Sequence, residues 1–200
     1  MAVVKKRGRP RKDKAAPVSV ERRILDTACQ LFYEEGLHAV GIDRLLVAAG
    51  AAKASLYSHY ASKDELVAAY LDALGRGWRA RVEERIAPTD GRAGLRALFE
   101  LVEEWVRSKT FRGCPFLNAV SELPDPAHPG RKAVRRHREW LHGLVRGLVA
   151  SAGIRDVARV SRALVVLYDG AIASAAQDGD PGAVGAASHA ASRLLDEQSR

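Results

Sequence analysis

The spacing of apolar residues is the feature that most restricts the fold of this chain. These residues recur every three to four positions from residue 19 almost to the C-terminus. Such spacing places apolar side chains on one face of an α-helix. No stretch shows the apolar–polar alternation of a half-buried strand, and Gly and Pro separate the helical stretches. The sequence therefore predicts an all-α fold, with helices over residues 19–35, 42–49, 53–60, 63–86, 92–109, 115–123, 130–151, 154–177 and 181–198.

The length and composition indicate a globular protein. The chain has 200 residues, of which 47% are hydrophobic and 28% charged, enough for one large domain or two small ones. The longest stretch without Asp, Glu, Lys or Arg covers only residues 181–192, whereas about 18 apolar residues are needed to cross a bilayer. No apolar segment typical of a secretion signal follows the basic N-terminus. We therefore expect a cytoplasmic protein without a membrane partner.

Basic charge is concentrated in residues 1–14, which contain seven Lys or Arg and one acidic residue. Residues 1–18 lack apolar periodicity, so we expect them to form a disordered basic tail. Its run KKRGRPRK resembles an AT-hook, in which Gly and Pro keep the chain extended. Arg7 and Arg9 would then enter a narrow DNA minor groove. The alternative is an arm that contacts phosphates without sequence preference.

Residues 42–60 contain two short amphipathic helices joined at Gly50, where a residue without Cβ can adopt a left-handed conformation. The inward positions of this pair are apolar: Ile42, Leu45, Ala49, Ala51 and Leu56. The second helix would leave outward a short, mostly polar surface that fits a major groove. This surface consists of Lys53, Ala54, Ser55, Tyr57, Ser58 and His59. Any corner between two helices shares this spacing, so the pattern indicates a DNA-reading helix-turn-helix without proving one.

The start of the following helix strengthens this interpretation. Ser62 is a good N-cap with Glu65 three positions later. The backbone N–H groups of the helix start and the Lys63 ammonium would suit a DNA phosphate, although Lys63 could instead be merely solvated. Tyr57 and Tyr60 flank the same surface, and we expect Tyr60 to lie in the core.

Residues 22–66 resemble the DNA-binding domain of TetR/AcrR-type bacterial transcriptional regulators. The resemblance rests on Ile24-Leu25, Leu31-Phe32, Gly36, Ala49-Gly50, Leu56-Tyr57 and Ser62-Lys63, with Ala28, Lys53, Tyr60 and Leu66. Three positions depart from the family pattern: Val40-Gly41 replaces a hydroxyl residue, Leu46 a small Ala, and Ala51-Ala52 the usual Val-Ser.

The resemblance implies a homodimeric, ligand-responsive repressor or, less often, activator. We expect a repressor that binds a palindromic operator and is released by a small molecule. It divides the chain into a DNA-binding domain over residues 19–66 and a ligand-binding and dimerisation domain over residues 67–200. By position, Lys53, Ala54 and Ser55 would approach base edges, and Tyr57, His59 and Lys63 would contact phosphates. His59 could equally be a plain exposed residue.

The later helices contain candidates for a ligand cavity, namely aromatic side chains with scattered polar groups. The candidate ligand-binding residues are Trp105, Phe111, Cys114, Phe116, Asn118, Glu122, His137, Trp140 and Tyr168. The alternative is an ordinary core. The last two helices are rich in Ala and Gly, which suits close packing in a dimer interface but would also suit a monomeric core.

The sequence offers no evidence for catalysis, a cofactor or a metal. Cys29 and Cys114 are the two cysteines of the chain, and His137 and His142 are five positions apart, a spacing that does not put two ligands on one helix face. We therefore expect a non-enzyme. The alternatives are an architectural DNA-binding protein whose C-terminal half only dimerises and, third, a helical enzyme or ligand carrier with a vestigial DNA module.

Overall fold

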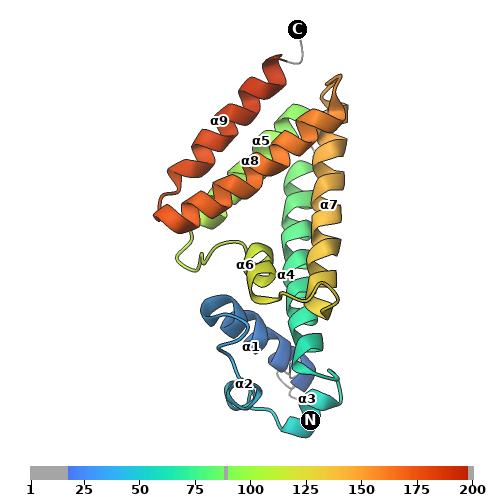
Figure 1. Ribbon diagram of the computed structural model, residues 1–200, viewed down its shortest axis with the longest axis vertical. Helices are drawn as coiled ribbons and strands as arrows, with labels where there is room; N and C mark the ends of the chain where they lie inside the picture. Colours follow the sequence, from blue (N-terminus) through green and yellow to red (C-terminus); the bar gives the residue numbers. More distant parts are fainter. Residues whose placement is uncertain (1–17, 88–89, 198–200) are drawn as a thin grey trace, which may run out of the picture.

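A computed structural model describes residues 18–87 and 90–197, and these residues form nine α-helices and no β-strand, which confirms the predicted all-α fold (Figure 1). The helices are α1 (Val20–Glu35), α2 (Ile42–Ala49), α3 (Lys53–Tyr57), α4 (Lys63–Ile86), α5 (Gly91–Val106), α6 (Pro115–Glu122), α7 (Pro129–Ser151), α8 (Val157–Asp178) and α9 (Gly182–Glu197). Within the described ranges, no helix is long and apolar enough to cross a bilayer.

Helix α4 begins at its predicted N-cap, and α1 begins at a serine of the same kind. The hydroxyl of Ser19 accepts a hydrogen bond from the backbone N–H of Arg22, and the hydroxyl of Ser62 accepts one from Glu65, so each satisfies a donor that the first turn leaves free. Gly41 occupies the N-cap of α2 without a side-chain bond. These starts were predictable because an N-cap acts on residues only two or three positions away.

Three helices fall three residues short of a predicted bound. Helix α5 ends at Val106 rather than residue 109. Helix α3 ends at Tyr57 rather than residue 60, because the N–H groups of both His59 and Tyr60 donate to the carbonyl of Leu56 and tighten the chain into a turn. Helix α8 starts at Val157 rather than residue 154, because the Asp156 carboxylate caps it. The apolar pattern had included residue 154, which is indeed buried but precedes the helix.

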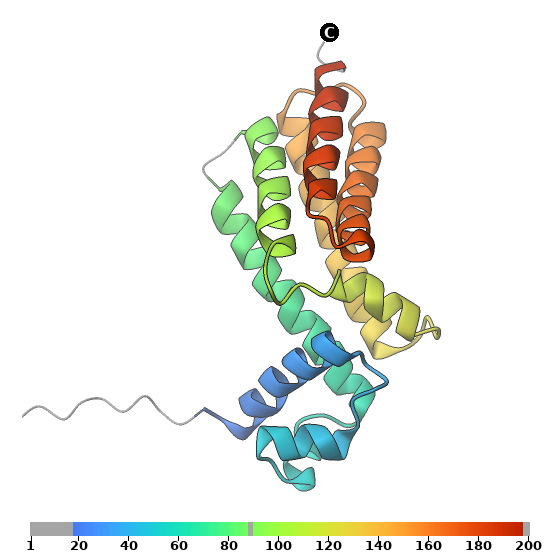
Figure 2. The same cartoon turned by 90° about the vertical axis from the view of Figure 1, so that its left-hand side faces the viewer.

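The molecule is elongated, with α1–α3 at one end and α5, α8 and α9 at the other (Figures 1 and 2). Helices α4 and α7 pack side by side and run between the two ends. Two hydrophobic clusters fill the interior: a lower one around α1–α3 and an upper one around α5, α7, α8 and α9. The lower cluster includes Leu66, Val67, Phe116 and Ala133. The helix-turn-helix region therefore packs directly on α4, α6 and the start of α7.

The upper cluster requires a very close approach between α5 and α7. A Cβ added to Gly91 would lie 2.2 Å from the carbonyl oxygen of Leu148 and 2.5 Å from the amide nitrogen of Ala152. Only glycine fits this position, because both neighbours are backbone atoms that cannot rotate away. The start of α5 therefore packs directly against the end of α7.

Candidate nucleic-acid interface and internal cavity

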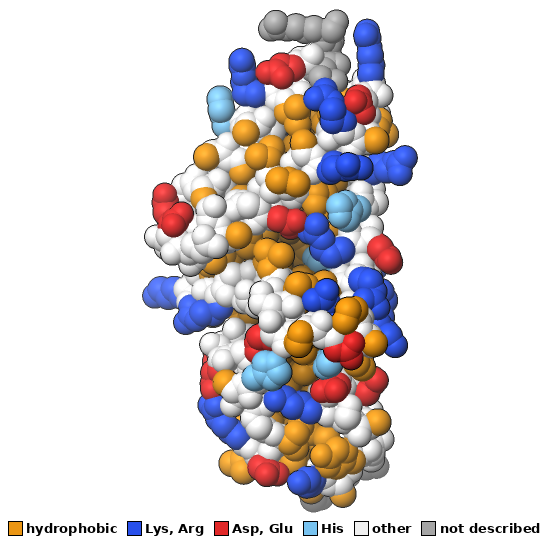
Figure 3. Space-filling model, viewed as in Figure 1, with side chains coloured by type: hydrophobic (Ala, Val, Ile, Leu, Met, Phe, Trp, Pro, Cys, Tyr) orange, Lys and Arg blue, Asp and Glu red, His pale blue; other side chains and the backbone are white. Residues whose placement is uncertain are grey.

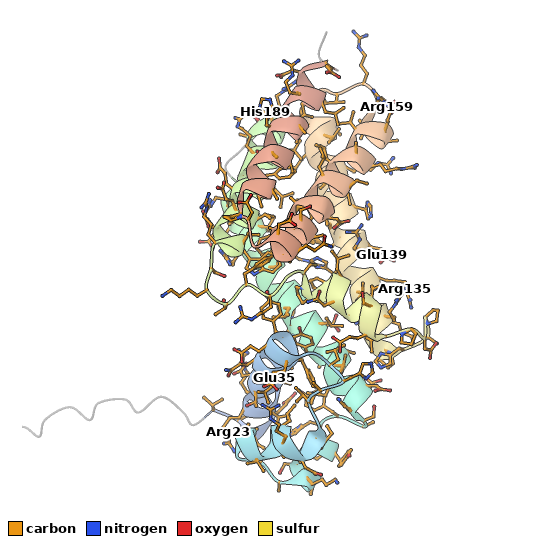
Figure 4. All side chains as sticks on the ribbon, turned by 60° about the vertical axis from the view of Figure 1, so that its left-hand side comes forward. Arg23, Glu35, Arg135, Glu139, Arg159 and His189 are labelled. Atoms are coloured by element: carbon orange, nitrogen blue, oxygen red, sulfur yellow. The ribbon has the colours of Figure 1, made fainter. Side chains whose placement is uncertain are left out.

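Helices α2 and α3 form a tight corner whose interior is fully packed. Leu45 and Leu56 are completely buried, and Gly50 adopts the left-handed conformation predicted for it, with φ 58° and ψ 43°. Arg23 on α1 donates hydrogen bonds to the carbonyls of Ala49 and Gly50, at 3.3 and 3.1 Å (Figure 4). The guanidinium thus satisfies carbonyls at the end of α2. Sequence reasoning missed this role, because Arg23 lies 26 positions away from Ala49.

The predicted reading residues lie together on the outer side of this corner. Lys53, Ala54, Tyr57 and His59 are exposed, and Ser55 is half-buried. We call these five residues the α3 surface. The Lys53 ammonium lies 3.7 Å from the Asp43 carboxylate with most of its side chain in solvent, and the ring of Tyr57 is 47% exposed. The surface is therefore accessible to a partner, while its backbone is held by the buried leucines beneath it.

Lys63 and Tyr60 lie next to the α3 surface in the sequence, and both side chains contact other parts of the same chain. The Lys63 ammonium donates to the carbonyl oxygen of Leu37 at 2.6 Å and lies 5.8 Å from the centre of the Phe32 ring. Partial burial lowers the pKa of Lys63. The sequence did not predict this contact, and a phosphate contact by Lys63 stays a prediction. Tyr60 is buried, as expected.

Arg7 and Arg9, the two predicted minor-groove contacts, lie outside the described residues.

A cavity of about 310 Å³ lies between the helix-turn-helix region and the upper helices. Five of the nine predicted ligand residues line it: Trp105, Cys114, Phe116, His137 and Tyr168. The other lining residues were not predicted: Cys29, Tyr33, Ala73, Leu74, Gly77, Trp78, Arg81 and Pro115. Most of these come from α1 and α4, so the cavity is not confined to the C-terminal half of the chain.

Four predicted ligand residues do not line this cavity. Phe111 packs edge-on against Trp105, with ring centres 5.2 Å apart. Trp140 lies behind His137, and the Arg79 guanidinium sits 5.2 Å from the centre of the Trp140 ring.

Asn118 and Glu122, the other two, lie further along α6 and contact other partners. The Asn118 amide donates to the carbonyl of Arg112, and the Glu122 carboxylate binds the loop after α1. Asn118 and Glu122 instead line a separate depression between α1 and α6. Asn118 and Glu122 lie four positions apart on α6, and the sequence did not predict the partners of either side chain.

His137 and Trp78 line the cavity, and each has a buried polar atom without a hydrogen-bond partner. The imidazole of His137 is 7% exposed, and it stacks on the Phe116 ring with centres 3.6 Å apart and planes within 5°. Its Nδ1 atom and the indole Nε1 of Trp78 are buried without a partner. Burial, assisted by the charges of Arg138 and Arg79, lowers the pKa of His137 to about 4, so the ring is neutral at neutral pH.

The two cysteines of the cavity are protonated at neutral pH. Burial raises the pKa of Cys29 to about 11 and also raises the pKa of Cys114. Because the thiolate is the reactive form, neither residue has the environment of a nucleophile. Residues 18–87 and 90–197 contain no group of three His, Cys, Asp or Glu side chains that could hold a metal ion.

Helix α6 connects the cavity to the helix-turn-helix region. Its N-terminal end, Pro115 and Phe116, lines the cavity. At its C-terminal end, the Glu122 carboxylate accepts hydrogen bonds from the backbone N–H groups of Leu37 and His38, at 2.7 and 3.1 Å, and His38 Nε2 lies 2.7 Å from the carbonyl oxygen of Glu122. We call this contact the Glu122 clasp. It holds the loop that leads from α1 into α2.

The segment before α6 is tied to α1 as well. The hydroxyl of Tyr33 donates to the carbonyl of Gly113 at 3.0 Å and accepts from the backbone N–H of Arg112 at 2.9 Å. Any change in the position of α6 would therefore act on α1 and on the loop after it.

The fold and the site together define a class: an all-α protein with a helix-turn-helix domain at one end and a helical domain behind it, with a cavity where the two meet. The family model for bacterial regulatory proteins of the tetR family matches residues 24–70. The model for the tetracyclin repressor-like C-terminal domain matches residues 91–191.

Individual relatives agree with these models. The crystal structure of a TetR-family transcriptional regulator from Streptomyces coelicolor is 40% identical, with a TM-score of 0.85, and the match covers 90% of this chain and 96% of that one. The transcriptional activator FasR of Mycolicibacterium smegmatis is 37% identical over 92 residues, 43% of this chain and 41% of FasR. The transcriptional repressor KstR2 of Mycobacterium tuberculosis is 36% identical over 85 residues, 40% of this chain and 42% of KstR2.

The chain belongs to the TetR family of bacterial regulatory proteins. The matches to FasR and KstR2 span only about two fifths of those proteins. All three relatives are named as transcriptional regulators, in agreement with the expectation that this chain is not an enzyme.

Proposed function

We propose that this protein is a homodimeric repressor that binds a palindromic DNA operator through its α3 surface and releases it when a small molecule occupies the cavity. The observation that carries the proposal is the shared position of α6, which lines the cavity at one end and holds the loop before α2 at the other. A ligand that displaces α6 would change the helix-turn-helix region without touching DNA. We place this activity in the cytoplasm.

The DNA contact is assigned to the exposed residues of the corner. Lys53, Ala54 and Ser55 lie at the start of α3, the end of a recognition helix that approaches base edges. Tyr57, His59 and Lys63 would contact phosphates. Arg7 and Arg9 of the basic tail would add a second contact, in the minor groove or along the phosphates.

Dimerisation is assigned to the outer face of α8 and α9. This face carries a shallow apolar groove lined by Ala163, Val166, Leu167 and Leu194 among others, and the Val166 side chain is 65% exposed. Apolar side chains gather on this face in Figure 3. A second copy would bury them and would present two α3 surfaces to half-sites about 34 Å apart on the duplex.

Many of the small residues predicted for this interface are already used within one chain. Ala171 and Ala175 of α8 and Ala187 and Ala191 of α9 are buried, because α8 and α9 pack tightly against each other. The proposed interface therefore depends on the outward residues of the same helices, which would complete a four-helix arrangement across two chains.

DNA selection followed by footprinting tests the proposal. Genomic fragments bound by the purified chain should yield a short palindromic footprint, and Lys53→Ala should weaken binding by about tenfold or more, as expected for a lost base contact. Arg155→Ala is the control, because this exposed arginine lies in the loop between α7 and α8, at the opposite end of the molecule from the α3 surface. Broad coverage of A/T-rich DNA would favour an architectural protein instead. A chain that binds no DNA at low salt, or that stays monomeric, would refute the proposal.

A further inference from the structure

The cavity is shaped for a flat aromatic molecule. Its walls include the rings of Tyr33, Trp78, Trp105, Phe116 and Tyr168. The Trp78 and Trp105 rings lie 5.5 Å apart at 47°. The cavity measures about 310 Å³, roughly twice the volume of about 150 Å³ that holds one benzene molecule in an engineered protein cavity. This size corresponds to about two fused rings.

The charge around the cavity favours an anion over a cation. Arg81 lines the cavity with about half of its side chain in solvent, and no Asp or Glu of the described chain lines it. The nearest carboxylate to Arg81 is that of Glu104 at 3.8 Å, and Arg85 binds the same carboxylate more closely, at 3.0 Å. The Arg81 guanidinium is therefore available to a ligand carboxylate.

We infer that the cavity binds a planar aromatic carboxylate of about two fused rings, with its rings against Trp78, Trp105 and Phe116 and its carboxylate at Arg81. This inference rests on the proposed function in one respect, that the cavity is the ligand site of the regulator. The aromatic walls select a flat molecule over a flexible aliphatic one, because ring faces stack at little cost in conformational entropy. Arg81 selects the anion.

Calorimetric titration of the full chain with three probes tests the inference. The probes are 2-naphthoate, the cation 2-naphthylmethylammonium and the aliphatic anion decanoate. The expected Kd for 2-naphthoate is lower than the other two by about tenfold or more. Tighter or equal binding of the cation or of decanoate would overturn the inference, and so would the absence of binding by all three.

Two matched variants test the role of Arg81. Arg81→Gln should weaken 2-naphthoate binding by about tenfold, because a charge-assisted contact is lost, and should change binding of neutral 2-naphthol by less than about threefold. Arg96→Gln is the control, since Arg96 is an exposed arginine of α5 that does not line the cavity. Equal effects of the two variants, or none for Arg81→Gln, would overturn the assignment. Circular dichroism would establish that both variants are folded.

The thiols report where the probe binds. Cys29 and Cys114 both line the cavity and are the two cysteines of the chain, so saturating 2-naphthoate should slow their modification by methyl methanethiosulfonate by about fivefold or more. Modification at an unchanged rate would place the probe elsewhere and overturn the inference.

Failure of this inference and failure of the proposed function give different results. If 2-naphthoate binds as expected but leaves DNA affinity unchanged, the ligand class stands and the proposed regulation fails. If decanoate releases DNA and 2-naphthoate does not, the regulation stands and the ligand class is wrong.

Discussion

The α2–α3 corner and the cavity are packed in opposite ways. In the corner, Leu45 and Leu56 are wholly buried, and Arg23 satisfies the carbonyls that end α2. Around the cavity, large aromatic rings border a volume of about 310 Å³, and polar atoms of Trp78 and His137 lack partners. A surface that must match DNA needs a rigid support, whereas a ligand site needs space. Stability is therefore concentrated under the α3 surface and is given up around the cavity.

The largest expected effect comes from opening the corner. Leu45→Ala should lower the free energy of unfolding by about 2–5 kcal/mol, because the truncated side chain leaves a void in a well-packed site. Urea unfolding followed by circular dichroism measures this loss. Val47→Ala on the same helix is the control, because Val47 is 84% exposed, and its effect should stay within about 0.5 kcal/mol. Equal losses for both variants would contradict the rigid packing of the corner.

A second effect concerns the pH dependence that His137 confers on the cavity region. Its pKa is about 4 in the folded protein against 6.5 in the unfolded chain, so protonation favours unfolding. The contribution of His137 is complete above pH 6.5 and is lost as the pH falls through this window toward 4, by up to about 3 kcal/mol. Denaturant titrations at pH 7.5 and pH 4.5 measure the loss.

Two variants separate the contribution of His137 to this pH dependence from that of other groups. His137→Phe should lose less stability than the wild type between these two pH values, because the buried titrating ring is gone. The exposed His142 lies on the same helix, and His142→Phe should retain the full dependence. Identical pH profiles for the wild type and His137→Phe would show that the burial of this ring has no energetic consequence.

The Glu122 clasp connects the α2–α3 corner with the cavity. Weakening it should uncouple DNA affinity from ligand binding. Glu122→Gln should lower the free energy of unfolding by about 1–2 kcal/mol, because the bonds from Leu37 and His38 lose their charge assistance. It should also reduce the ligand-induced change in DNA affinity, measured by fluorescence anisotropy of labelled operator DNA. The exposed Glu139 on α7 (Figure 4) provides the control variant Glu139→Gln. A full ligand response in Glu122→Gln would refute the clasp as the connection.

The smallest effect is a gain in stability at the cavity wall. A Cβ added to Gly77 meets no atom within 4 Å, so Gly77→Ala should stabilise α4 by about 0.5–1 kcal/mol, because alanine loses less backbone entropy. Gly143→Ala on α7 is matched, since its Cβ also meets nothing within 4 Å. Both should raise the melting temperature, but only Gly77→Ala should weaken 2-naphthoate binding, because Gly77 lines the cavity. Weaker binding in Gly143→Ala would contradict this placement of the ligand.

The corner was largely predictable from the sequence, and the cavity was not. The turn at Gly50 and the leucines on either side of it depend on residues close in the sequence, and only the bond from Arg23 to Ala49, 26 positions away, was missed there. The cavity depends on Tyr33, Trp78 and Tyr168 meeting across three helices. An amphipathic pattern shows that such side chains face inward, but not whether a neighbour or a cavity lies opposite.

The amino-acid sequence alone determined which segments are helical, where most of them begin and which side chains α3 exposes. Each of these properties follows from the backbone and from neighbours within a few turns. Only the tertiary structure decided that Glu122 binds the N–H of Leu37, 85 positions earlier, and that Cys29 of α1 shares a cavity with Tyr168 of α8. Such contacts form because distant helices pack along particular faces, and the choice among possible faces is made by the whole core at once.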